Sequence, residues 1–305
     1  MTVGYKIVCS DQHKLVVCIG GRLNIFDIEK RQKIVSCRPI PNPSYAAFSP
    51  NGKILAVKST SGRIVVLNSF SGEVLCDHKN QKEGEGCQLH FSPDGEMLID
   101  ASWKGIITIR KAFEPTIIKR EVFEGEHIGE ISMDANRNNW LFQHGGPFRQ
   151  EKKARSCFCL ILHTWPLTEA LRQHCFGEHI IWASALSPDA SRICLIRDCK
   201  PGTDMRIIGA TDGEILACRQ FGMISSKIYW SWDSEIIAVI RKSFAESCFA
   251  FYKSSDLSLI GTIPGDYPSS ICFLPNSDQV VLGSWQFSRL ARLEDFLSGQ
   301  VKMCK

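Results

Sequence analysis

The sequence of 305 residues lacks any run of about 18 apolar residues, so we expect no transmembrane helix. Its first residues also lack the apolar core and the small-residue cleavage site of a signal peptide. It has no Asn-x-Ser/Thr glycosylation acceptor, because Asn42 is followed by Pro43. These absences favour a location in the reducing cytoplasm, where most of the fourteen cysteines are expected to be buried free thiols.

An excess of charge of one sign is also missing. Lys and Arg number 36 against 32 Asp and Glu, which leaves a net charge of +4. Nucleic-acid-binding domains usually carry a stronger basic bias on one face, so a nucleic-acid partner is not expected. Hydrophobic residues make up 44% and charged residues 22% of the chain, which is typical of a globular protein.

The common catalytic patterns are absent as well. The sequence has no Gly-x-x-x-x-Gly-Lys-Ser/Thr loop, no Gly-x-Ser-x-Gly elbow, no His-Glu-x-x-His pair and no acidic calcium loop. We therefore expect neither an enzyme nor a cofactor. His163, His174, Cys175 and His179 lie near one another in sequence, but no Cys-x-x-Cys pair accompanies them, and we expect no metal site.

What the sequence does contain is an internal repeat. SPNGKILAV at 49–57 recurs as SPDGEMLI, SPDASRICLI and LPNSDQVVL, with weaker copies SDQHKLVV, SMDANRNNWLF and SWDSEIIAVI. In chain order, the copies begin at positions 10, 49, 92, 132, 187, 231 and 274. The spacing is close to 40 residues except for a longer step between the fourth and fifth copies. Such a period is typical of repeat architectures.

Each repeat predicts four β-strands. Ser-Pro-Asn/Asp-Gly is typical of a type I turn, and it joins a short apolar stretch to a run rich in Ile, Leu and Val. A second pair of strands follows, joined by Ser-Gly or Asp-Gly turns. The best helical candidate, 167–174, is short. We predict an all-β fold consisting of a single seven-bladed β-propeller of four-stranded antiparallel blades. The blades are expected near 1–40, 41–83, 84–124, 125–177, 178–222, 223–264 and 265–305.

With these turns and strand pairs, the chain resembles the WD-repeat propellers. The Trp-Asp position of that family is Phe26-Asp27 in the first repeat and Leu67-Asn68 in the second, and Gly-His is absent throughout. The chain thus resembles a divergent member. Its first inner strand is expected at 5–9 and its last outer strand at 301–304, so that each blade uses contiguous sequence.

The resemblance implies that the connections between second and third strands lie on one face. The residues that these connections contribute are Trp103, Phe148, Arg149, Arg197, Lys242, Phe244, Trp285 and Phe287. The longest connection, 143–156, also has a local charge of +3 and carries Lys152, Lys153 and Arg155. Trp and Arg are enriched in binding hot spots. The competing interpretations are packing of each tryptophan between blades and a solvated hairpin tip for the basic loop.

Three polar residues fall at equivalent positions of predicted inner strands: His90, Glu130 and Tyr229. We expect them to line the central channel, where the simplest interpretation is contact with water. The leading functional hypothesis is a non-enzymatic scaffold that binds a protein or peptide partner on the loop face. The alternative is an enzyme or small-ligand binder that uses the channel mouth.

Overall fold

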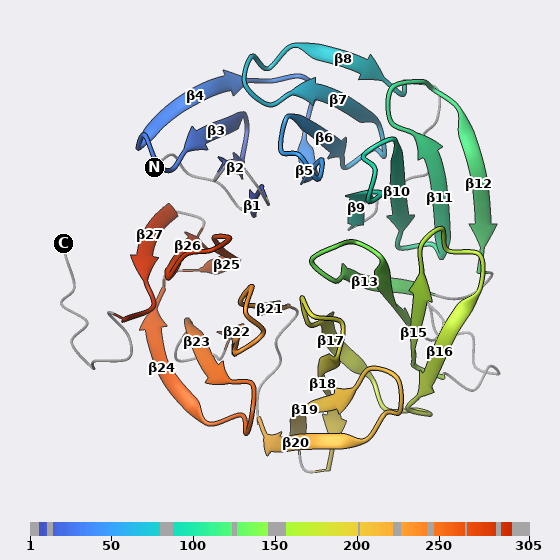
Figure 1. Cartoon of the computed structure of the whole chain (residues 1–305), viewed down its shortest axis with the longest axis vertical. Helices are drawn as coiled ribbons and strands as arrows, with labels where there is room; N and C mark the ends of the chain where they lie inside the picture. The colour runs from blue at the N-terminus through green and yellow to red at the C-terminus, as the bar shows by residue number, and fades with distance from the viewer. Residues whose placement is uncertain are drawn as a thin grey trace. The chain divides into compact units, whose positions relative to one another are not determined.

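The computed structural model describes residues 6–10, 15–79, 88–123, 127–145, 157–200, 202–221, 227–242, 247–265, 267–284 and 288–294. These residues form twenty-seven β-strands, grouped in seven antiparallel sheets (Figure 1). The chain divides into two compact units. Unit 1 comprises Met1–Gly129 and His144–Ser156, and unit 2 comprises Glu130–Gln143 and Cys157–Lys305.

Unit 1 contains three sheets, each made of four strands in sequence order. The first consists of β1 (Lys6–Cys9), β2 (Leu15–Ile19), β3 (Leu23–Asp27) and β4 (Gln32–Cys37). The second consists of β5 (Pro43–Phe48), β6 (Ile54–Ser59), β7 (Ile64–Asn68) and β8 (Val74–Asp77). The third consists of β9 (Gln88–Phe91), β10 (Met97–Ser102), β11 (Ile106–Lys111) and β12 (Ile117–Val122).

The remaining four sheets lie mostly or wholly in unit 2. The fourth consists of β13 (His127–Met133), β14 (Asn139–Gly145), β15 (Cys159–Thr164) and β16 (Ala170–Cys175). The fifth consists of β17 (Ile181–Leu186), β18 (Arg192–Cys199), β19 (Gly202–Gly209) and β20 (Ile215–Gln220). The sixth consists of β21 (Ile228–Trp230), β22 (Ile236–Lys242), β23 (Ser247–Lys253) and β24 (Leu259–Pro264). The seventh has three described strands, β25 (Pro268–Phe273), β26 (Gln279–Ser284) and β27 (Ser288–Arg292).

Apolar side chains on both faces of the middle strands hold neighbouring sheets together within each unit. In unit 1, Leu15 and Ile25 of the first sheet share a buried cluster with Leu55 of the second. In unit 2, Ile207 of the fifth sheet shares a cluster with Val239 of the sixth. Burial of one such side chain stabilises the fold by about 1.5–3 kcal/mol. This two-sided packing explains why β2 and β6 read as continuous apolar runs rather than as alternating patterns.

The repeated Ser-Pro-Asn/Asp-Gly segment forms the predicted turn. The amide of Gly95 donates to the carbonyl oxygen of Ser92 at 3.0 Å, which closes the turn. The Ser92 hydroxyl donates to Asp94 and accepts the amide N–H of Met97 at 2.9 Å. Asp94 in turn accepts the amide N–H of Glu96. The same network recurs at the turns that begin with Ser49, Ser187 and Ser231.

In the fourth sheet, the turn begins two residues later than the repeat alignment predicted. Asp134, not Ser132, occupies the position that serine has in the other turns. Its amide donates to the Asn139 carbonyl, as the Ser92 amide donates to the Met97 carbonyl. The Asp134 carboxylate accepts the amide N–H groups of Asn138 and Asn139. One carboxylate therefore replaces the hydroxyl and carboxylate of the other turns.

Two further expectations are corrected. Residues 170–174 of the helical candidate 167–174 belong to the strand β16, because pairing with β15 supplies backbone partners along its length. Of the ten free cysteines among the described residues, only Cys18, Cys159 and Cys194 are buried. The reason is that the last strand of a sheet is exposed, and four cysteines lie on such strands: Cys37, Cys76, Cys175 and Cys218.

Seven successive antiparallel sheets, six of them complete four-stranded meanders as described, confirm the prediction of an all-β, seven-bladed β-propeller. Each sheet is hereafter called a blade. The outer strand expected at 301–304 lies outside the described residues, as does Tyr5 of the expected first strand. In the described parts of the chain, no helix has the length and apolar character needed to cross a bilayer.

Candidate functional site

Of the residues predicted for the docking face, the structure describes three. Trp103 follows β10, Arg197 lies in β18 and Lys242 ends β22, where its backbone is opposite Ser247. The other predicted residues lie outside the described parts of the chain: Phe148, Arg149, Lys152, Lys153, Arg155, Phe244, Trp285 and Phe287. Trp103 and Arg197 are therefore the two predicted docking side chains whose surroundings are defined.

Trp103 lies in the tight turn between β10 and β11, which Gly105 closes by donating its amide to the Ser102 carbonyl. Its side chain is 36% exposed. The carbonyl oxygen of Trp103 accepts a hydrogen bond from Nδ1 of His127 at 3.0 Å. The backbone of this turn is thus held in place while the indole ring remains accessible to a partner.

Arg197 is engaged within its own blade. It lies directly opposite Asp204 on β19, and its guanidinium contacts that carboxylate at 3.2 Å. Arg206 reaches the same carboxylate at 2.8 Å. The Asp204 side chain is 7% exposed. A docking partner would have to compete with Asp204 for Arg197, so the arginine orders the blade 5 hairpin more than it offers a free cation.

In unit 1, the first strands of three blades carry a row of polar side chains. Lys6 of β1 places its ammonium group over the ring of Tyr45 on β5. The Tyr45 hydroxyl donates to Gln88 of β9 at 2.8 Å, and Nε2 of His90 lies 3.2 Å from the same amide oxygen. Of the residues in this row, only His90 was predicted from the sequence to line the channel. The contacts of Lys6, Tyr45 and Gln88 depend on how β1, β5 and β9 lie beside one another, which no local pattern encodes.

In unit 2, burial and the charges nearby set the ionisation of Tyr229. Burial raises the pKa of the Tyr229 hydroxyl above its usual value; the nearby Lys227 lowers it and the Glu130 carboxylate raises it. At neutral pH the tyrosine is therefore protonated and suited to donating a hydrogen bond rather than to acting as a base. The turn of blade 4 begins at Asp134, so Glu130 on β13 occupies the position that Gln88 has on β9. Gln88 is two residues from His90 and projects from the same face of β9.

Comparisons with known proteins agree on the fold. No family model matches the sequence. The β-propeller domain of Myceliophteria thermophila Cps50 (Swd1) superposes with a TM-score of 0.76 at 12% identity and covers 96% of this chain and 98% of that one. A chain of the mitotic checkpoint complex superposes with a TM-score of 0.74 at 12% identity and covers 96% and 88%.

Two other matches come from a third solved structure and from a curated sequence. Kuenenia stuttgartiensis hydrazine synthase contains a chain that superposes with a TM-score of 0.75 at 10% identity, over 96% of both chains. A 77 kDa echinoderm microtubule-associated protein from Lytechinus variegatus is 39% identical over 64 residues. That match spans 21% of this chain and 10% of the sea urchin protein, so it concerns a small part of a much longer molecule.

Proposed function

Because the chain is a divergent, WD-repeat-like seven-bladed β-propeller, we propose that it is a non-enzymatic scaffold. It binds a protein or peptide on the face that carries the connections between second and third strands. Two kinds of observation support this proposal. The paired strands of each blade form a scaffold that presents the connecting loops, and loops on a rigid scaffold commonly carry binding residues. The named neighbours include a chain of a multiprotein assembly, the mitotic checkpoint complex.

The accessibility of Trp103 is the observation that carries the proposal. Among the described tryptophans, it alone is more than one-third exposed. Others are buried or have their indole N–H groups engaged: Trp140 donates to the Arg137 carbonyl, and Trp232 donates to the Phe273 carbonyl. A rigid, accessible indole is the type of side chain that most often anchors an interface.

The partner that we propose presents an acidic segment beside an apolar anchor. The connection at 143–156 has four basic residues against Glu151 alone, and Lys104 is exposed next to Trp103. Charge-assisted contacts to such a segment would set orientation and association rate, while the indole would supply most of the affinity. We further propose that this interaction takes place in the cytoplasm, where exposed thiols such as those on the outer strands stay reduced.

Site-specific photocrosslinking tests this function. A benzophenone amino acid replaces Lys104, which is exposed beside Trp103, so that the indole is kept; cross-linked partners are purified after irradiation of cells. The control places the same group at Phe113, which is 42% exposed but lies in the β11–β12 turn, at the opposite end of the same blade. We expect a defined adduct from position 104 that is absent from position 113.

A variant that combines Trp103→Ala, Arg149→Glu and Trp285→Ala provides the complementary measurement. We expect it to recover the cross-linked partner at a level reduced by tenfold or more, since a hot-spot tryptophan alone contributes about 2 kcal/mol or more. Equal recovery of the partner by the variant and the unmodified chain would exclude this face as the binding surface.

A further inference from the structure

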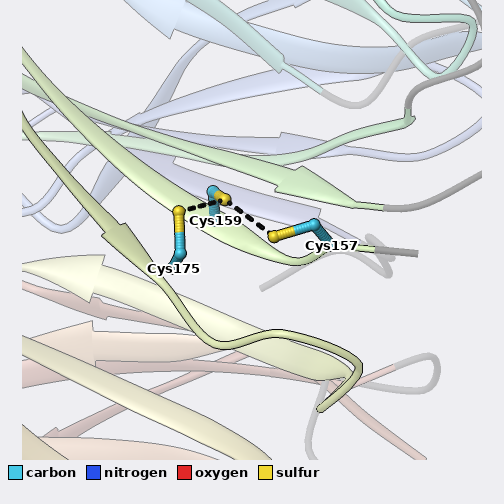
Figure 2. A group of neighbouring side chains, drawn as sticks. All are labelled: Cys157, Cys159 and Cys175. Atoms are coloured by element: carbon cyan, nitrogen blue, oxygen red, sulfur yellow. Dashed lines mark hydrogen bonds between the residues drawn. The ribbon is translucent and has the colours of Figure 1, made fainter. Parts of the chain in front are cut away.

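Three cysteine side chains meet on the outer hairpin of blade 4. Cys157 precedes β15, Cys159 begins β15 and Cys175 ends β16. Figure 2 shows their sulfur atoms turned toward one another. The Sγ atoms of Cys157 and Cys159 are 3.5 Å apart, and those of Cys159 and Cys175 are 2.9 Å apart. All three sulfur atoms lie within 4.8 Å of one another.

Strand pairing produces this cluster. Cys159 and Cys175 are direct partners in the β15–β16 ladder. The backbone of Phe158 donates to the Gly177 carbonyl and accepts from the Phe176 amide. The adjacent pair, Cys159 and Cys175, is therefore of the non-hydrogen-bonded type, in which opposite side chains come closest. Residues two apart in an extended segment project to the same side, which brings Cys157 to this pair as well.

The amide side chain of Gln173 adds donors to the cluster. Its Nε2 lies 3.3 Å from Sγ of Cys159 and 3.2 Å from Sγ of Cys175. Sulfur is a weak hydrogen-bond acceptor as a thiol and a stronger one as a thiolate, because charge-assisted hydrogen bonds are the stronger kind. Burial and the neighbouring Cys175 thiol raise the pKa of the Cys159 thiol to about 12, and the Gln173 hydrogen bond opposes this shift only in part. Without a metal the sulfur therefore keeps its proton, and the Gln173 amide is placed to stabilise the thiolate that a metal ion would create.

We propose that Cys157, Cys159 and Cys175 bind a thiophilic metal ion, Zn²⁺ by their chemistry. Zinc prefers thiolate ligands at about 2.3 Å in tetrahedral geometry, which places two ligand sulfurs about 3.8 Å apart. The Cys157–Cys159 separation is already close to this value. The Cys159–Cys175 pair must open by roughly 0.9 Å, which small rotations about the Cα–Cβ bonds supply. Each thiol that binds releases its proton to solvent.

Solvent completes the coordination. Cys157 and Cys175 are exposed, so water reaches the fourth position of the tetrahedron. Three protein ligands with one open position give an exchangeable site rather than a closed structural one. Among the described residues, the group whose ligand atoms all lie within 4.8 Å of one another consists of the three cysteines and includes no histidine, so none of His163, His174 and His179 is placed to fill the fourth position.

A disulfide between Cys159 and Cys175 is the competing chemistry, since non-hydrogen-bonded pairs have a Cα separation of about 4.5 Å, within the range of disulfides. That alternative needs an external oxidant and gives no role to Cys157 or to the two donors from Gln173. Metal binding uses all four side chains. The two chemistries predict opposite results when metal is added to the reduced protein: a metal site takes up one ion per chain, whereas a cysteine pair that only forms a disulfide takes up none.

The test uses the full chain, reduced with a phosphine and stripped of metal. Zn²⁺ is titrated in competition with a chromophoric chelator, and Cd²⁺ is added separately to observe the ultraviolet sulfur-to-cadmium charge-transfer band. We expect one ion per chain, with zinc-edge X-ray absorption giving three sulfur ligands and one oxygen ligand. Cys175→Ser should abolish stoichiometric binding, and Gln173→Leu should weaken it by about tenfold or more.

The matched control is Cys218→Ser, because Cys218 is likewise an exposed free thiol on the last strand of a blade. This variant should bind as the unmodified chain does, and circular dichroism should confirm that all variants are folded. Equal binding by Cys175→Ser and the unmodified chain would overturn the proposal. So would failure of the reduced chain to bind either ion, with or without a Cys159–Cys175 disulfide in the protein as isolated.

Discussion

The ammonium group of Lys58 forms an ion pair with the carboxylate of Asp100 in unit 1, and both side chains are completely shielded from solvent. Lys58 belongs to β6 and Asp100 to β10, so the pair joins blades 2 and 3. Lys58 also donates to the Ala101 carbonyl at 3.1 Å, and Arg110 reaches the other Asp100 oxygen at 3.3 Å. One buried carboxylate thus forms ion pairs with two buried cations.

Removal of this carboxylate should be strongly destabilising. Asp100→Asn removes the carboxylate that pairs with the buried ammonium group of Lys58, and breaking a buried pair in this way costs about 3–5 kcal/mol. Urea denaturation of the full chain, followed by fluorescence, measures the change. The control is Asp77→Asn, which breaks the partly exposed pair with Arg63 and should cost at most about 1 kcal/mol. Similar midpoints for the two variants would show that the Asp100 network is not under this electrostatic constraint.

The Arg63–Asp77 pair makes a small contribution to stability that depends on pH. The hydrogen bond from Arg63 holds the pKa of the Asp77 carboxyl below its usual value of 3.8. A depressed pKa in the folded state means that the contribution is present at all pH values above 3.8 and is lost as pH falls through the lower folded value. The stability difference between the unmodified chain and Asp77→Asn should therefore be constant near neutrality and shrink in acid. A difference that grows as pH falls would contradict this assignment.

The repeat was readable from sequence because each turn depends on local chemistry. Ser92, Asp94 and Gly95 interact within one short segment, so their spacing predicted both the turn and the two strands beside it. In blade 4 the same alignment was displaced by two residues, since Asp134 performs the roles of both serine and aspartate. A pattern of residue types cannot reveal that one side chain replaces two.

What the sequence concealed depends on contacts between distant strands. LTEALRQH has helical propensity, yet the β15 edge imposes strand geometry on its second half, because tertiary pairing overrides propensity. Cys159 and Cys175 are separated by 16 residues and meet only through that pairing. The docking prediction fared differently: Trp103 is accessible, whereas Arg197 has a partner in Asp204 that spacing alone did not indicate.

Gly72 should tolerate no side chain. It has φ of +75°, and a Cβ at this position would lie 2.8 Å from Cγ1 of Val35, on the outer strand of blade 1. Gly177 has φ of +61°, but a Cβ there would meet no atom within 4 Å. Gly177→Ala should cost about 1 kcal/mol, the backbone strain alone. Gly72→Ala should lower the free energy of unfolding by this strain and by about 1–3 kcal/mol more from overpacking against Val35. Thermal unfolding of both variants should separate them, and equal losses would show that blade 1 yields to the added methyl group.

The hydroxyl of Ser92 should contribute more to stability than its size suggests. It is buried, accepts the Met97 amide and donates to Asp94, so Ser92→Ala leaves a buried N–H group without its acceptor. Such a loss costs about 1–3 kcal/mol.

Ser71 offers the matched control: its hydroxyl accepts the Glu73 amide at 3.2 Å in an exposed turn of the neighbouring blade, where water replaces the lost acceptor. Ser71→Ala should therefore change stability by less than about 0.5 kcal/mol. If urea denaturation gave the two alanine variants equal midpoints, the repeated serine would have to be explained by turn formation rather than by the buried hydrogen bond. Amide hydrogen exchange at Met97 distinguishes these cases, because only loss of the hydrogen bond accelerates exchange at that site before global unfolding.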